Sequence, residues 1–193
     1  MSINYRISAS NPNAHLFTVS IDIEAHQQDV LTLRLPAWLP GSYMIRDFAK
    51  NIITFDAKND KGDVAFYKTD KQTWQVQTQG LATTIEYQVY AFDLSVRTAF
   101  LDNQRGFFNG SSTFLEVVEL ANLPCQLEIV KPNGFDGWKV ATGMPRATGT
   151  DIYQFGHYLA DNYQHLIDCP VELGDFDVIE FSVANVPHYL VFA

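Results

Sequence analysis

Residues 15–24 read HLFTVSIDIE, and apolar and polar side chains alternate from Phe17 to Glu24. The apolar positions are Phe17, Val19, Ile21 and Ile23. A period of two is typical of a strand with one buried face and one face in water. The same period recurs at residues 31–35, 74–76, 85–89, 127–129 and 179–183. The pattern therefore predicts several antiparallel strands that share a core.

Turn-forming residues separate these runs and predict short hairpins. They occur at residues 59–62, 79–80, 102–103, 132–134 and 174–175. Two stretches, 46–51 and 158–167, are expected to be helical or irregular, the second because its apolar residues fall near helical spacing. Many strands with few helices indicate an all-β fold. We expect a twisted antiparallel β-sandwich with one or two short helices, in which residues 1–193 form a single β domain.

Composition limits the classes of partner. The chain has 193 residues, 47% of them hydrophobic, and 13 basic against 22 acidic residues give a formal net charge of -9. No stretch concentrates Lys or Arg, so neither nucleic acid nor an anionic membrane is expected as a partner. Cys125 and Cys169 are far apart and fit two free thiols in a reducing compartment. With no signal-peptide pattern at the start, we expect a cytoplasmic protein.

The end of the sequence is apolar. Residues 187–193 read PHYLVFA and predict a strand without the polar tail that usually closes a domain. We expect a buried strand near a domain boundary, with more protein beyond it in the parent.

The motifs of familiar catalytic sites are missing. None of the five histidines lies in a His-Glu-x-x-His pattern, which would place two zinc ligands and a base on one helical face. There is no Gly-x-Ser-x-Gly elbow and no phosphate-binding Gly-x-x-x-x-Gly-Lys loop. His157, His165 and Asp161 could share a face, but we interpret them as surface residues. No catalytic and no metal-binding residue is predicted in this chain.

The distinctive segment is LPAWLPGSYMIRDF, residues 35–48. Its prolines fix the backbone around a large indole, and Pro-Gly sets a tight turn after the preceding strand. We predict a rigid loop. Its structural residues are Trp38, Pro40, Gly41, Tyr43, Arg46 and Asp47. For Arg46, a structural ion pair is favoured over the binding of a substrate carboxylate.

This segment resembles the hallmark of the glycyl aminopeptidase family of zinc metallopeptidases, Leu-Pro-x-Trp-x-Pro-Gly-Ser-Tyr-x-x-Arg-Asp-Phe. Three further segments resemble the same family: KQTW at 71–74, SVR at 95–97 with FFNG at 107–110, and the stretch from 163 to 174. The resemblance spans nearly the whole chain. It implies a saddle-like N-terminal β domain, followed in family members by a catalytic domain and usually a PDZ-like domain.

The resemblance also implies a function that this chain cannot perform alone. The parent would be a zinc aminopeptidase that removes small N-terminal residues such as glycine or alanine, with zinc bound downstream and no cofactor in this chain. The expected partners are its own downstream catalytic domain and a peptide substrate. By analogy of position, the loop at 105–112 would help to hold the substrate's free amine. The candidate substrate-binding residues are Asn109, Gly110, Ser111 and Glu116.

Blander interpretations of these residues stay open. The loop at 105–112 is equally an ordinary turn between strands, and Glu116 is equally a solvent-facing strand residue. Two other functions also fit the composition. One is a stand-alone ligand-binding β-sandwich that uses its 14 Phe, 9 Tyr and 3 Trp for stacking. The other is a protein-interaction module that adds an edge strand to a partner.

Overall fold

The computed structural model describes residues 1–192, and Ala193 lies outside the described residues. The strands are β1 (Ile3–Asn11), β2 (Leu16–Ile23), β3 (Leu31–Arg34), β4 (Ile52–Asn59), β5 (Gly62–Asp63), β6 (Phe66–Lys68), β7 (Thr73–Val76), β8 (Thr83–Tyr90), β9 (Ala99–Leu101), β10 (Arg105–Phe108), β11 (Glu116–Val117), β12 (Cys125–Val130), β13 (Lys139–Thr142), β14 (Gly156–Ala160), β15 (Val171–Gly174), β16 (Asp177–Val183) and β17 (Val186–Phe192). The helical elements are α1 (Tyr163–Asp168) and the 3-10 turns η1 (Pro12–Ala14), η2 (Phe48–Asn51), η3 (Gly110–Ser112) and η4 (Val118–Leu120).

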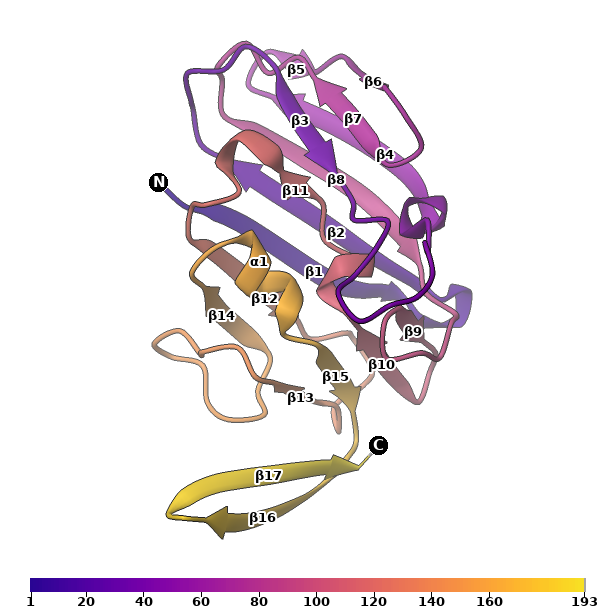
Figure 1. Cartoon of the computed structure of the whole chain (residues 1–193), viewed down its shortest axis with the longest axis vertical. Coiled ribbons are helices and arrows are strands. Elements are labelled where there is room, and N and C mark those ends of the chain that lie inside the picture. Colours follow the sequence, from indigo (N-terminus) through magenta and orange to yellow (C-terminus); the bar gives the residue numbers. More distant parts are fainter. Residues whose placement is uncertain (193) are drawn as a thin grey trace.

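A seven-stranded sheet forms the first layer, in the order β14-β12-β1-β2-β8-β4-β5 (Figure 1). Its inner face includes the apolar side chains predicted to be buried in residues 15–24. Of these, Phe17, Val19 and Ile21 have no exposed surface. One pair departs from the expected antiparallel pattern, because β1 and β12 run parallel. A parallel pair requires a long crossover connection, which the chain makes through the second layer before it enters β12.

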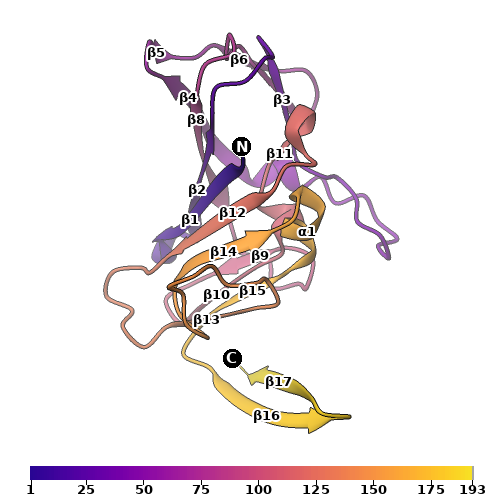
Figure 2. The same ribbon diagram turned by 90° about the vertical axis from the view of Figure 1, so that its left-hand side faces the viewer.

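Two four-stranded sheets, β11-β3-β7-β6 and β13-β15-β10-β9, form the second layer. In Figure 2, β3, β11 and α1 lie across from β1 and β2. Aromatic rings fill the space between the layers. Phe17 meets Phe108 edge to face at 5.5 Å, and Phe55 stacks on Trp74 at 5.4 Å. The expected all-β sandwich is confirmed.

The prediction that residues 158–167 are helical or irregular is wrong in its first part. Tyr158 and Leu159 belong to β14, which pairs antiparallel with β12. Tyr158 is buried and Leu159 is exposed, so the period there is two. The helix α1 begins only after Asn162, whose side-chain oxygen accepts from the His165 amide at 2.9 Å and caps the first turn. The other predicted helical stretch contains η2.

The strand predicted at the end of the sequence exists as β17, but it is not buried within this domain. It pairs with β16 only, and within residues 1–192 this hairpin forms a separate two-stranded sheet. Both figures show the hairpin standing apart from the sandwich. In the described part of the chain, no helix has the length and apolar character needed to cross a membrane.

Candidate functional site

The motif residues form a projecting loop, which we call the motif loop (residues 37–46), between β3 and η2. Pro40 and Gly41 occupy the centre of a turn in which the Ser42 amide donates to the Leu39 carbonyl at 3.0 Å. Gly41 has a φ of +78°, a conformation that a turn with Pro-Gly at its centre requires and that glycine adopts without strain. The sequence motif therefore encodes a defined backbone turn.

Hydrogen bonds also tie the base and the middle of the motif loop. At the base, the Arg46 amide donates to the Ala37 carbonyl at 2.8 Å. In the middle, the Trp38 indole N–H donates to the Ser42 carbonyl at 2.7 Å. Apart from the Trp38 indole, no exposed side chain at the tip of the loop contributes to these bonds. The predicted rigid loop is therefore consistent with the observed hydrogen bonds.

The tip of the motif loop exposes apolar side chains. Tyr43 is completely exposed, Ile45 is 72% exposed, and Trp38 and Met44 are more than half exposed. In Figure 2 the motif loop is the purple loop that projects from the sandwich beyond α1. A fixed loop that holds apolar side chains in water is typical of an interaction surface. Trp38 and Tyr43 are thus outside the core, whereas Tyr163 and Leu166 are inside it.

Arg46, at the end of the motif loop, does not form the ion pair expected for it in the described part of the chain. Within residues 1–192 Arg46 forms no ion pair, and its Nε lies 3.5 Å from the Ser42 hydroxyl. Asp47 instead pairs with Lys71 at 3.5 Å. Both groups of this pair are well exposed, so the pair adds little stability. It does bring together two segments that carry the family resemblance, residues 35–48 and 71–74.

A second exposed apolar loop, residues 93–98, lies beside the motif loop. The Arg97 guanidinium donates to the Gly41 carbonyl at 3.4 Å and joins the two loops. Leu94 and Val96 are 66% and 71% exposed. The 93–98 loop is closed on itself by the Thr98 hydroxyl, which donates to the Asp93 carbonyl at 2.7 Å. Sequence reasoning matched residues 95–97 to the family but did not place them against the motif loop.

Asn109, a candidate substrate-binding residue, is hydrogen-bonded to the 93–98 loop. The nitrogen of its side-chain amide donates to the Val96 carbonyl at 3.3 Å. Its side-chain oxygen accepts from the Ser111 amide at 3.1 Å and caps η3. The Asn109 side chain is therefore occupied by contacts within the chain, and it positions the 93–98 loop.

Gly110 and Ser111 lie inside the protein. A Cβ on Gly110 would stand 2.8 Å from the Ile167 Cα, so only glycine fits this contact between η3 and α1. Ser111 has no exposed surface. These two candidates pack η3 against α1, and neither presents a side chain to the surface in this structure.

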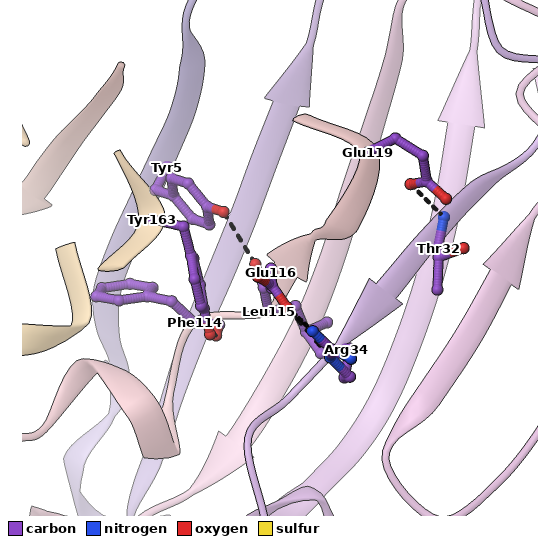
Figure 3. A network of polar contacts seen from close by, with 8 residues as sticks. All are labelled: Tyr5, Thr32, Arg34, Phe114, Leu115, Glu116, Glu119 and Tyr163. Carbon is purple, nitrogen blue, oxygen red and sulfur yellow. Dashed lines mark hydrogen bonds and ion pairs between the residues drawn. The ribbon is translucent and has the colours of Figure 1, made fainter. Parts of the chain in front are cut away.

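Glu116, the remaining candidate, belongs to a polar network on the strap, which we define as residues 113–119 (Figure 3). Its carboxylate accepts from the Arg34 guanidinium at 2.6 and 3.1 Å across the β11–β3 pair. The Glu116 side chain is only 17% exposed. Further along the strap, the Glu119 carboxylate accepts from the Thr32 amide at 2.9 Å. Glu116 is therefore a paired structural residue here, and the view of it as a free solvent-facing side chain does not hold.

Three buried tyrosines hold the strap to the core. The hydroxyls of Tyr5, Tyr87 and Tyr163 donate to carbonyls of the strap at 2.8–2.9 Å. Burial raises the pKa of all three phenols above the ordinary value, so they remain protonated donors at neutral pH. Periodicity placed Tyr87 in the core, but nothing in the sequence indicated what these hydroxyls bind.

The described residues contain no candidate metal centre. No group of three or more His, Cys, Asp and Glu side chains within residues 1–192 is arranged to hold a metal ion. His165 lies 3.4 Å from Asp161, and His157 is placed separately on β14. Both cysteines are free thiols.

The comparison with family models identifies this fold. The model of the peptidase M61 N-terminal domain matches residues 4–175. The chain belongs to this family. No curated protein matches the chain.

Solved structures of longer chains resemble this M61 N-terminal domain. The crystal structure of an aminopeptidase N family protein from Idiomarina loihiensis is 43% identical, with a TM-score of 0.93 over 98% of this chain and 32% of that chain. The present chain thus spans about a third of that relative. An M1 zinc metallopeptidase from Deinococcus radiodurans matches at 7% identity with a TM-score of 0.49, covering 94% of this chain and 43% of that one. That similarity is too low to support an argument.

Proposed function

We propose that this M61 domain packs on a catalytic unit and shapes the rim of its substrate cleft, using the motif loop and the 93–98 loop. The observation that carries this proposal is the motif loop itself. Its backbone is fixed by internal hydrogen bonds, whereas the Tyr43 side chain at its tip is completely exposed. Rigid presentation of an apolar tip stabilises binding because little side-chain and loop freedom is lost on contact.

We further propose that the catalytic unit is a zinc aminopeptidase that removes small N-terminal residues such as glycine or alanine from peptides. The motif at residues 35–48 supports this substrate class. Zinc in that unit would polarise the scissile carbonyl and its attacking water. The residues of the present chain would only orient the bound peptide and exclude water. A cytoplasmic location and the lack of nucleic-acid and membrane partners belong to the same proposal, supported by the net charge of -9 and the two free thiols.

The proposed substrate-binding residues act in this scheme through the loops that they support. Asn109 would act by holding the 93–98 loop through the Val96 carbonyl. Gly110 and Ser111 would act by fixing Asn109. Glu116 would meet a substrate ammonium only if it exchanged Arg34 for that group, and we propose a supporting role for it. Positioning of this kind contributes to rate when it restricts the reacting groups to a productive geometry.

A chimera tests this function. The matched third of the Idiomarina loihiensis protein is replaced by the present chain, and cleavage of glycyl and alanyl amides is measured before and after a chelator. We expect chelator-sensitive cleavage by the chimera and none by the 193-residue chain alone. Chelator-sensitive cleavage by the chain alone would refute the assignment of the chemistry to another unit.

The role of the motif loop is tested within the same chimera by Tyr43→Ala. We expect kcat/KM to fall about tenfold, the effect of about 1.4 kcal/mol of lost transition-state binding. Tyr67→Ala is the matched control, because Tyr67 is an exposed tyrosine on β6, in another part of the fold. Equal activities of the two variants would show that the motif loop does not contribute to the cleft.

A further inference from the structure

The β16–β17 hairpin has two different faces. Residues that pair directly across the hairpin lie on the same face, and the register pairs Ile179 with Leu190 and Phe181 with His188. One face is therefore apolar apart from an Asp at its end and a His that stacks on Phe181 at 5.3 Å. Its large apolar side chains, each between 42% and 56% exposed, are Ile179, Phe181, Val183, Val186, Leu190 and Phe192.

The other face is turned toward the sandwich. Tyr189 meets Tyr153 edge to face at 6.4 Å. Tyr189 and Val191 also line a hollow of about 460 Å³, whose opposite wall includes Met144 and Arg146. The half-buried residues of the hairpin, Val178 and Val191, both lie on this inner face. The apolar face therefore points away from the rest of the described chain.

Such a hairpin is an unusual element for a protein in water. A two-stranded sheet alone is at best marginally stable, and it needs a third strand or a packed apolar surface. Six large apolar side chains on one face also make a contiguous patch of the kind that marks an interaction site. The turn is nevertheless well specified, because Ala184 and Asn185 both have positive φ, as a two-residue hairpin requires. The hairpin is thus encoded to form, while its apolar face lacks a cover within residues 1–192.

The family boundary falls at the start of this hairpin. The M61 N-terminal model ends at residue 175. Phe176, the next residue, is buried, and its carbonyl accepts from Lys139, so the sandwich closes there. The Idiomarina loihiensis structure matches 98% of this chain, and the missing 2% is about four residues, far fewer than two seven-residue strands. Its counterpart of the hairpin therefore occurs in a chain about three times as long.

We infer that the β16–β17 hairpin packs with the neighbouring catalytic unit and not with the sandwich. Its apolar face is buried against an apolar surface of that unit. This inference rests on the proposed function, because it takes the occupant to be the catalytic unit of an M61 peptidase. The sandwich and the hairpin then form two separately packed bodies, joined at residues 175–176. The inner face of the hairpin contacts the sandwich through Tyr189, which lies beside the hollow.

Amide hydrogen exchange tests this inference. Peptides that cover residues 177–192 are followed by mass spectrometry in the 193-residue chain and in the chimera with the remaining two thirds of the Idiomarina loihiensis protein. We expect fast exchange in the chain alone and exchange slowed at least about 100-fold in the chimera, as for an element that joins a folded core. If the chimera does not fold, the hairpin of the unaltered Idiomarina loihiensis protein is measured instead, and fast exchange there overturns the inference.

The outcomes separate this inference from the proposed function. Fast exchange of the hairpin in a chimera that cleaves peptides would overturn the inference and leave the function intact. A protected hairpin in a folded chimera without chelator-sensitive activity would support the inference and overturn the function. A saturable dimer of the 193-residue chain in sedimentation velocity, with the hairpin protected, would make a second copy the occupant and overturn the inference.

Two variants of the apolar face provide the matched comparison. Phe181→Ser and Leu190→Ser in the chimera are expected to speed exchange of residues 177–192 at least about tenfold, because the buried contact loses apolar area. Ile53→Ser is the control, since Ile53 on β4 is 53% exposed, as much as the hairpin residues, but lies in the large sheet. An equal effect of all three variants would show that the hairpin face is not the buried one.

Discussion

Removing the Tyr87 hydroxyl tests how the strap is held to the large sheet. This hydroxyl donates to the Thr113 carbonyl at 2.9 Å and accepts from the Leu115 amide at 3.0 Å. Tyr87 and both strap residues have no exposed surface, so water cannot replace the lost partner. A buried polar group left without a partner costs about 1–3 kcal/mol. Tyr87→Phe leaves two such groups, and we expect the free energy of unfolding to fall by about 3 kcal/mol.

The other two strap tyrosines set the scale for this value. Tyr5 and Tyr163 each donate one hydrogen bond, to the carbonyls of Leu115 and Phe114. Their Phe variants should therefore cost about 1.5 kcal/mol each, half the Tyr87 value. The Phe ring keeps the buried aromatic contacts in all three variants, so the comparison isolates the hydroxyl.

Urea unfolding at 25 °C, followed by fluorescence, measures these differences from the midpoint and the slope m. The slope should not change, because each variant buries the same surface. Tyr67→Phe is the control, since Tyr67 is exposed and its variant should stay within about 0.5 kcal/mol of the wild type. A Tyr87→Phe protein as stable as this control, or no less stable than Tyr5→Phe, would refute the argument from paired hydroxyls.

Two further predictions concern packing and buried charge. Gly110→Ala should lower the melting temperature, with a cost of about 1–3 kcal/mol, because the new Cβ would lie 2.8 Å from the Ile167 backbone; Gly143→Ala, with open space around it, should not. Arg105→Met leaves the half-buried Glu172 carboxylate without its ion-pair partner and should cost about 1–3 kcal/mol at pH 7. Burial already raises the pKa of Glu172, so the folded state holds this proton more tightly than the unfolded state. The Arg105→Met cost should therefore shrink as the pH is lowered through the folded pKa toward the unfolded one, and a pH-independent cost in chemical denaturation would contradict the assignment.

The alternation of side chains was sufficient to predict three strands of the large sheet, β2, β8 and β12. Residues 17–23 and 85–89 bury their apolar sides as the period of two indicates, because each strand pairs with neighbours that share the same inner face. Periodicity misled over residues 158–167, where a strand and a helix follow one another within ten residues. The few apolar positions in such a short window fit either period, and only the pairing of β14 with β12 decides.

The candidate site was predicted in part. The motif at residues 35–48 specified a rigid loop because Pro-Gly turns act locally. The position of residues 93–98 beside it was beyond local reasoning, because the Arg97–Gly41 contact joins segments 56 residues apart. The same holds for Asn109 and Glu116. Their residue types suit substrate binding, but the Val96 carbonyl and the Arg34 guanidinium occupy them, and such tertiary partners leave no mark on the local pattern.

Residues 17–23 and 179–183 show what alternation cannot express. Both runs place large apolar side chains on one face, yet Phe17 has no exposed surface and Phe181 is 42% exposed. The period of a strand follows from its backbone alone, whereas burial depends on what packs against the strand. The sandwich supplies that cover for β2 from its own second layer. For β16 and β17 the register fixes an apolar face just as firmly, and the cover that we infer for it is a surface of the catalytic unit instead of a second layer of the sandwich.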